Sequence, residues 1–300
     1  MLNQLWSQPH MKIVTDNGID IDPRYLEGLE VTVVPLTIRL DNQDYRGGID
    51  ISGQAFYERV RASKDFPTTS APAQGEFAEV YKQIAQTDPD IISIHISAKL
   101  SATYNSARLG AELAQQESGA NITVVDSGSV SGIEGWMVEA AAKAAKAGWP
   151  RERILKLLTN IRAHADTLFV PETLKYLVHG GRVSGAQGIA AGLLNIKPIL
   201  KIDHKEGTLG RVTAVRSSKK AVKHMVEIIE MQYKRGASLR VQIEYSDALD
   251  MVMYADELLR STFDCHMMPT TTITPLVGAH LGPGAIAVVY APNNLFDELR

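Results

Sequence analysis

The chain has 300 residues, of which 45% are hydrophobic and 22% are charged. This balance is typical of a folded globular protein with one large or two medium-sized cores, and it excludes disordered and collagen-like chains. The 31 Lys and Arg residues against 34 Asp and Glu residues give a net charge of -3, which does not favour nucleic acid or an anionic membrane surface as a partner.

Cysteine usage and hydropathy indicate a cytoplasmic protein. The single cysteine, Cys265, cannot form an intramolecular disulfide and has no neighbouring cysteines with which to bind zinc. No run reaches the roughly 18 apolar residues of a membrane-spanning helix, so we expect no stable membrane insertion. Residues 1–10 are polar and patternless, which is typical of a disordered extension, and they lack the pattern of an export signal. Met11 is therefore a second candidate for the natural start.

Residues 11–160 alternate short β-branched runs with longer segments of helical period. The alternation predicts βαβ units and a mainly parallel sheet with flanking helices. The predicted strands are Lys12–Thr15, Val31–Leu40, Asp90–Ile96 and Asn121–Val125. Ligands of such sheets bind at the carboxyl ends of the strands, so we expect functional side chains in the loops that follow them.

Residues 161–300 differ in texture and predict a second α/β lobe. Two alternating runs, Lys197–Asp203 and Thr208–Arg216, flank a turn that ends in Gly207, which predicts an antiparallel hairpin. Further strands alternate with two long helices, so this lobe should contain a mixed sheet. These strands are Leu239–Tyr245, Thr270–Thr274 and Ala285–Tyr290, and the helices are Ser217–Arg235 and Asp247–Ser261. The predicted fold is thus α/β with two lobes, and the border, within 148–168, is drawn at 160/161.

Two polar segments early in the chain admit both a structural and a functional interpretation. Thr15–Gly18 follows the first strand, where Asp and Asn commonly form a turn with their own backbone. Pro67–Pro72 holds three hydroxyl groups between two prolines, which keep the backbone extended and the hydroxyls exposed to a ligand. Thr69 or Ser70 is equally well suited to capping the helix that follows.

Three later segments also combine polar groups with turns. Ile96–Ser106 opens a helix, so its hydroxyls and free backbone donors form a place for an anion, although N-capping by Ser101 explains part of the pattern. Gly180–Ser184 follows a helix, where paired glycines commonly end helices. Gly278–Gly284 contains His280 between glycines, which indicates a close approach of the backbone to another group.

The motifs of several enzyme classes are absent from the sequence. It has no P-loop, no G-x-S-x-G elbow, no H-E-x-x-H zinc motif and no cysteine cluster. His95 stands between isoleucines on a predicted strand, which favours a buried histidine with hydrogen-bonding partners over a ligand.

Seven short segments, spread in order from residue 12 to residue 290, together resemble one protein family. They are Lys12–Asp16, Pro67–Ser70 with Pro72, Leu100–Ser106, Val125–Ser127, Leu174–Ser184, Leu194–Leu200 and Ala279–Gly284. These segments resemble the motifs of the DegV family of bacterial fatty-acid-binding proteins, which includes the FakB subunits of the fatty acid kinase system.

The resemblance implies two α/β lobes that hold one long-chain fatty acid, such as palmitate, stearate or oleate, between them. Thr69 and Ser101 match the residues that bind the fatty acid carboxylate in the family. Ser70, Arg182 and His280 match the polar network around this head group. The resemblance implies no metal and no cofactor other than the fatty acid itself.

The family resemblance further implies a carrier rather than an enzyme. A separate ATP-dependent kinase converts the bound acid to an acyl phosphate, and Arg216 matches an arginine that is associated with contacting this kinase. The sequence departs from the family pattern at Asn17, Ala71 and Ala102, where serine, glutamine and glycine are frequent. Ala102 adds a methyl group beside the expected carboxylate site but removes no hydrogen-bond donor.

Elementary energetics agrees with a division between tail and head group. Burying a methylene contributes roughly 0.8 kcal/mol, so an acyl tail of about fifteen methylenes contributes on the order of 10 kcal/mol before ordering costs. A hydrogen bond to a carboxylate contributes about 1.5–3 kcal/mol, so the hydroxyl groups set the orientation. The apolar stretch Gly185–Leu194 is a candidate wall of the fatty acid tunnel, or simply core.

Two other functions stay open from the sequence. The first is an acyl or phosphoryl transferase or hydrolase in which Ser101 is the nucleophile and His280 its base. The second is a binding protein for another small anion, which needs the hydroxyl groups but no long apolar tunnel.

Overall fold

The computed structural model describes residues 11–183, 196–203 and 206–299. The extension expected at residues 1–10, the candidate tunnel wall Gly185–Leu194, Ser184 and the first turn residues of the predicted hairpin, His204 and Lys205, lie outside the described residues.

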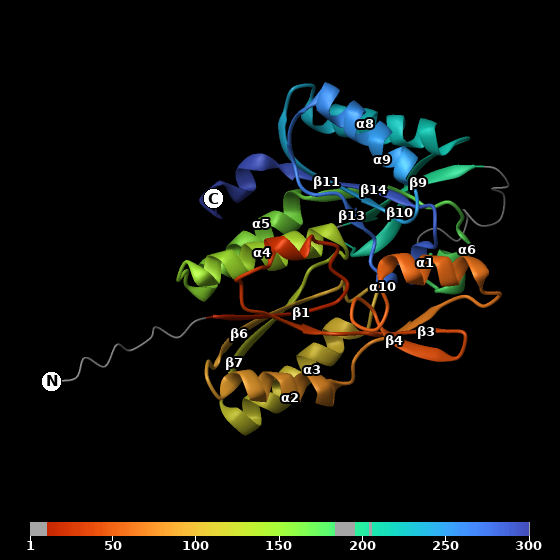
Figure 1. The fold of residues 1–300 in the computed structure, drawn as a ribbon. Helices are drawn as coiled ribbons and strands as arrows, with labels where there is room; N and C mark the ends of the chain where they lie inside the picture. The colour runs from red at the N-terminus through yellow and green to blue at the C-terminus, as the bar shows by residue number, and fades with distance from the viewer. Residues whose placement is uncertain (1–10, 184–195, 204–205, 300) are drawn as a thin grey trace.

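The first sheet is parallel throughout, as predicted, with the strand order β2-β1-β6-β7. Helices α2 and α3 cover one face of it, and α4 and α5 cover the other (Figure 1). The strands are β1 (Lys12–Asp16), β2 (Val31–Val34), β6 (Asp90–His95) and β7 (Asn121–Asp126), and the helices are α2 (Gln74–Ala85), α3 (Thr103–Ser118), α4 (Gly132–Lys146) and α5 (Arg151–His164).

The prediction of one strand over Val31–Leu40 is wrong, because the chain changes sheets within it. Strand β2 ends at Val34, and β3 (Thr37–Leu40) pairs with β4 (Gln43–Arg46) and β5 (Thr68–Ser70) in a small antiparallel sheet beside α1 (Gly53–Ala62). Pro35 has no N–H for a ladder, and the next N–H, that of Leu36, donates to Asn17 Oδ1 at 2.8 Å. Asn17 therefore holds the chain at this break.

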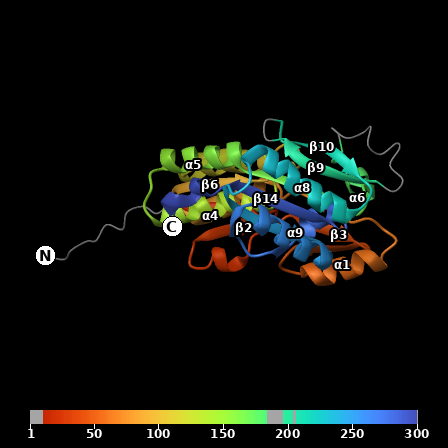
Figure 2. The same ribbon diagram turned by 90° about the horizontal axis from the view of Figure 1, so that it is seen from above.

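The second sheet is mixed, as predicted, and its strand order is β10-β9-β8-β14-β11-β12, with β13 also paired to β11. Strands β9 and β10 form the predicted antiparallel hairpin. Helices α8 and α9 pack on one face of this sheet (Figure 2). The strands are β8 (Asp166–Val170), β9 (Lys197–Asp203), β10 (Thr208–Val215), β11 (Ser238–Tyr245), β12 (Asp264–Met267), β13 (Thr271–Thr272) and β14 (Ile286–Pro292), and the helices are α8 (Ser218–Tyr233) and α9 (Leu249–Thr262).

Helix α10 is a short helix that lies where the two lobes meet. It packs against the small sheet, α1 and α6. The remaining elements are α6 (Lys175–His179), α10 (Pro275–Leu281) and the 3-10 helices η1 (Pro23–Tyr25) and η2 (Asn293–Leu299). The border drawn at 160/161 falls within α5, which runs without a break to the second sheet.

Helix α4 lies between the two large sheets. An Ala-rich helix that is apolar on nearly all sides is typical of a position with cover all around it, and nearly every residue of α4 is buried. One apolar cluster joins α4 to Ile13 and Ile92 of the first sheet and to Val289 and Ala291 of the second. This helix therefore sets the spacing between the lobes, and the cavity lies beside it.

Candidate binding cavity

A cavity between the lobes is lined mainly by aliphatic side chains. About 780 Å³ of space, part of it open to solvent, lies between the lining atoms. The apolar residues come from both lobes, so the cavity exists only in the assembled fold. They are Leu36, Ile96, Leu100, Val130, Phe169, Leu177, Ile202, Leu209, Leu276, Val277, Leu281 and Ala287.

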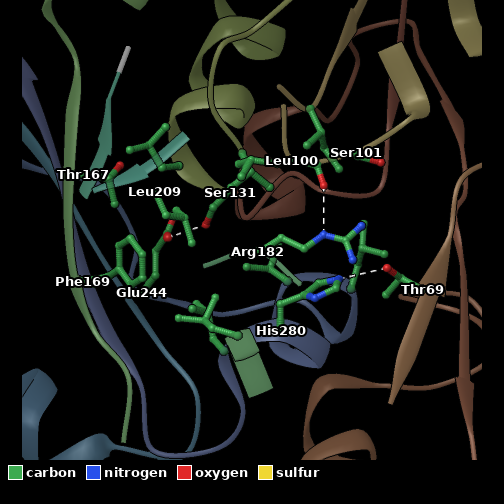
Figure 3. Close-up of a pocket in the computed structure, with 18 of the residues that line it drawn as sticks. Thr69, Leu100, Ser101, Ser131, Thr167, Phe169, Arg182, Leu209, Glu244 and His280 are labelled. Atoms are coloured by element: carbon green, nitrogen blue, oxygen red, sulfur yellow. Dashed lines mark hydrogen bonds between the residues drawn. The ribbon is translucent and has the colours of Figure 1, made fainter. Parts of the chain in front are cut away.

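Four of the predicted site residues line this cavity: Thr69, Ser101, Arg182 and His280. Thr69 is on β5 and His280 is on α10, and the Thr69 Oγ1 and His280 Nε2 atoms are 2.9 Å apart, within hydrogen-bond distance. Figure 3 shows Thr69, Ser101 and Arg182 on the same side of the cavity. The fold thus gathers four residues that lie far apart in the sequence.

Arg182 connects loops of the two lobes at this side of the cavity. Its Nε donates to the carbonyl oxygen of Leu100 at 3.1 Å, and its guanidinium also donates to the carbonyl of Gly180 (Figure 3). Burial lowers the pKa of Arg182 from its usual range, but a guanidinium stays charged at neutral pH. A fixed cation therefore stands beside Leu100 and Ser101.

The paired glycines before Arg182 have two roles. Gly181 has a φ of +70°, a left-handed conformation that ends helix α6. Gly180 lies against the imidazole, since a Cβ there would be 2.3 Å from His280 Nδ1. The motif is therefore both a helix end and a site of close approach to His280.

His280 is neutral at physiological pH. Burial, and secondarily the charge of Arg182, lower its pKa from 6.5 to about 4. Its Nδ1 makes no hydrogen bond with the described residues. The imidazole therefore acts here as a hydrogen-bonding group and not as a cation.

The loop that contains Ser101 opens helix α3, as predicted, but the N-cap of this helix is Ala102 and not Ser101. The Ser101 Oγ accepts a hydrogen bond from the Thr103 N–H at 3.3 Å and lies 2.8 Å from Thr103 Oγ1. The side chain is half-buried and lines the cavity. Ser101 and His280 are not hydrogen-bonded, since His280 contacts Thr69 through Nε2.

Ser70 and Arg216 do not line the cavity. Side chains alternate along a strand, so Ser70 faces away from Thr69 on β5 and is exposed. Neither Thr69 nor Ser70 caps α2, because the N-cap of this helix is Ala73, whose N–H donates to the Glu76 side chain at 2.6 Å. Arg216 is exposed between β10 and α8.

The loop after β1 has the structural role that turn chemistry indicated. Asp16 Oδ1 accepts from the Gly18 N–H at 2.8 Å, and Asp16 Oδ2 lies 3.0 Å from His95 Nδ1. His95 Nε2 lies 2.7 Å from Ser93 Oγ. His95 is fully buried with both nitrogens in contact with partners, which confirms the prediction of a core histidine.

The sequence analysis missed three polar residues of the cavity: Ser131, Thr167 and Glu244. Figure 3 shows Thr167 and Glu244 on the side opposite Thr69 and Ser101. Glu244 is on β11, where charged and polar residues alternate with Val241 and Ile243. This alternation could have indicated one polar face of the strand, but not that the face is buried.

The described residues contain no helix that is both long and apolar enough to cross a bilayer. In the same part of the chain, no three His, Cys, Asp or Glu side chains are grouped so that they could hold a metal ion.

Comparison with known proteins identifies the family. Residues 10–293 match the family model described as "Uncharacterised protein, DegV family". A DegV domain-containing protein of Deinococcus radiodurans is 35% identical over 280 residues, which cover 93% of this chain and 98% of the relative.

Solved structures show the same fold. A DegV family protein of Thermus thermophilus, for which fatty acid binding is described, has a TM-score of 0.86 and 31% identity, covering 94% of this chain and 99% of that one. DegV of Bacillus subtilis, described as a fatty acid binding protein, has a TM-score of 0.82 and 26% identity, covering 95% of this chain and 100% of that one. Since one family model and a relative of similar length both match nearly the whole sequence, this chain belongs to the DegV family.

Proposed function

We propose that this protein binds one long-chain fatty acid between its lobes, with the carboxylate at Thr69 and Ser101 and the tail along the aliphatic walls. The observation that carries the proposal is the cavity itself, which has apolar walls and one side with two hydroxyl groups and a cation. Buried carboxylates require hydrogen bonds or an opposite charge, and Arg182 supplies the charge. Fatty acid binding by the Thermus and Bacillus relatives supports the same ligand class.

His280 completes the head-group site by directing the proton of Thr69. A hydroxyl group donates only one hydrogen bond. When His280 Nε2 carries a hydrogen and donates to Thr69 Oγ1, the Thr69 hydrogen is free to bond a carboxylate. The 2.9 Å contact between these atoms supports this arrangement, and so does the lowered pKa of His280, which keeps the ring neutral.

We further propose that the protein is a cytoplasmic carrier that presents its fatty acid to a separate ATP-dependent kinase. Two observations support a carrier function and not an enzyme in which Ser101 is the nucleophile. The Ser101 hydroxyl contacts Thr103 and not His280, and a histidine with a pKa of about 4 is a weak general base at neutral pH. Exposed Arg216 is available for a protein partner.

The function is tested by identifying the small molecule that leaves with the purified protein. We expect mass spectrometry of an organic extract to detect a long-chain fatty acid in a ratio near one per chain. The delipidated protein should then rebind palmitate, stearate or oleate in calorimetry. A delipidated, folded protein that binds none of these acids would overturn the proposal.

The kinase step is tested separately. In a reaction with a fatty acid kinase and ATP, Arg216→Ala should lower acyl phosphate formation about tenfold or more while fatty acid affinity is unchanged. Arg211→Ala is the matched control, because Arg211 is an exposed arginine on the adjacent strand β10. Equal loss in both variants, or loss of fatty acid binding in Arg216→Ala, contradicts the role assigned to Arg216.

A further inference from the structure

The side of the cavity opposite the head-group site is polar, although the tail of an ordinary fatty acid is a hydrocarbon. Ser131, Thr167 and Glu244 line the cavity there (Figure 3). Glu244 and Thr167 are 1% and 4% exposed, so water from outside does not solvate them freely. A saturated chain offers these groups no hydrogen bond.

Ser131 connects two carboxyl groups on this side of the cavity, those of Asp20 and Glu244. Its Oγ lies 2.6 Å from Asp20 Oδ2 and 2.5 Å from Glu244 Oε2. One hydroxyl group donates only one hydrogen bond, so one of the two carboxyl groups must itself carry a proton and donate to Ser131. The pair therefore holds at most one negative charge, and that charge disfavours the carboxylate of a ligand at this side of the cavity.

Glu244 is held in place by its surroundings. Gln242 Nε2 donates to Glu244 Oε1 at 3.1 Å, and a Cβ on Gly132 would lie 2.3 Å from the same oxygen. The carboxyl group therefore has partners of its own and is fixed by packing. It makes this side of the cavity polar, but its own hydrogen bonds are made within the protein.

Thr167 is the group without a partner. Its Oγ1 is buried and makes no hydrogen bond with any described residue. The register places Thr167 and Gln242 opposite Val289, and Phe169 and Glu244 opposite Ala287. Thr167 and Glu244 therefore share one face of the sheet, two strands apart, so the Thr167 hydroxyl is a separate polar contact on the cavity wall.

We propose that Thr167 makes this cavity selective for acyl chains that carry a neutral oxygen substituent, a hydroxyl or keto group, along the tail. This inference rests on the proposed function and names a narrower class of ligand. The Thr167 hydroxyl donates to such an oxygen, whereas a plain methylene leaves it unpaired, which is unfavourable for a buried polar group. The negative charge near Asp20 and Glu244 disfavours an anionic oxygen substituent and so restricts the oxygen groups to neutral ones.

The test is a binding cycle between ligand and variant. Delipidated protein is titrated with stearate and with stearates that carry one hydroxyl or keto group at successive positions from the middle to the ω end. The measured quantity is the affinity of each analogue relative to stearate, in the wild type and in Thr167→Val. For the isomer whose oxygen reaches Thr167, we expect this ratio to fall about fivefold in the variant, the effect of one neutral hydrogen bond.

Three further variants separate this effect from structural damage. Thr167→Ser keeps the hydroxyl and should keep the preference. Thr167→Ala also removes the hydroxyl group, and it is used instead of Thr167→Val if the valine variant does not fold. Thr15→Val is the matched control, since Thr15 is a buried threonine on β1 whose hydroxyl also lacks a partner among the described residues and does not line the cavity. It should leave every ratio unchanged.

The outcomes distinguish the inference from the function on which it rests. If stearate binds but no isomer shows a ratio that depends on Thr167, the inference fails and fatty acid carriage stands. If neither stearate nor any analogue binds the folded, delipidated protein, both fail. A ratio that changes equally in Thr15→Val would also overturn the inference.

Discussion

The two sides of the cavity differ in charge, and the difference gives the cavity a direction. Among the described lining residues, Arg182 supplies the cation and Glu244 the carboxyl group, and these stand on opposite sides. Thr69 and Ser101 are on the side of Arg182, whereas Ser131 links Glu244 to a second carboxyl group, that of Asp20. An amphipathic acid with one ionised end is therefore favoured in one orientation only, with its carboxylate toward Arg182.

The largest effect should come from removing the hydroxyl groups of the head-group side. In Thr69→Val with Ser101→Ala, loss of two hydrogen bonds to a charged group should weaken stearate binding by a factor on the order of 1000. Calorimetry on delipidated protein measures it. Thr68→Val is the control, because Thr68 is exposed on the same strand. A double variant that binds stearate as tightly as the wild type would remove these hydroxyls from the site.

The opposite side should dominate the pH dependence of stability. Burial raises the pKa of Asp20 from 3.8 to about 6. The folded state therefore holds the Asp20 proton more tightly than the unfolded state. The stabilisation of the fold by this proton is complete below about pH 4 and is lost as the pH rises to about 6. The loss amounts to on the order of 3 kcal/mol.

Asp20→Asn removes this titration. Urea unfolding between pH 4 and pH 7 should show a free energy of unfolding that falls less steeply with pH in the variant than in the wild type. Asp44→Asn, which changes an exposed carboxyl group on β4, should leave the slope as it is. Parallel curves for the wild type and Asp20→Asn would show that Asp20 does not carry this dependence.

A methyl group at the start of α4 should disturb the packing around Glu244. In Gly132→Ala the new Cβ would meet Glu244 Oε1 at 2.3 Å and Val289 Cγ2 at 2.9 Å, and overpacking of this kind costs about 2 kcal/mol. Gly75→Ala on α2 has open space around it and should raise stability by up to about 1 kcal/mol. Thermal unfolding compares the two. Equal stability in both variants would contradict the close packing at Glu244.

The smallest effect concerns His280. Its pKa of about 4 in the free protein should rise when a carboxylate binds nearby, because an anion favours the charged imidazole. Binding should consequently tighten as the pH falls toward this range. An NMR titration with and without stearate measures the change, and the partly exposed His224 on α8, which does not line the cavity, serves as an internal control. An unchanged His280 curve would place the carboxylate elsewhere.

Strand and helix periods predicted most of the fold, and the errors have local causes. The hairpin of β3 and β4 is missing from the prediction, which ends one long strand at Leu40 and does not treat Asp41 and Asn42, directly after it, as a turn. Both have positive φ values, 52° and 60°, which matches the two-residue turns that favour Asn and Asp. This turn was predictable. The change of sheets at Leu36 was not, because it depends on Asn17, nineteen residues earlier.

The candidate site was predictable only in part. The resemblance pointed to Thr69, Ser101, Arg182 and His280, and the structure places all four around one cavity. Their roles toward a carboxylate stay predictions. Ser70 is adjacent to Thr69 in sequence, but the alternation of β5 turns it outward.

Strand β11 shows what the sequence determined by itself and what it did not. Its alternation assigns Arg240, Gln242 and Glu244 to one face and Val241 and Ile243 to the other. From the strand alone, such a polar face predicts exposure to solvent. Only the tertiary structure covers it with α4, where the indole N–H of Trp136 donates to Gln242 at 2.8 Å and Glu139 pairs with Arg240. The two-residue period of a strand determines which side chains share a face. The packing of other elements decides whether water, a helix or a ligand lies against that face.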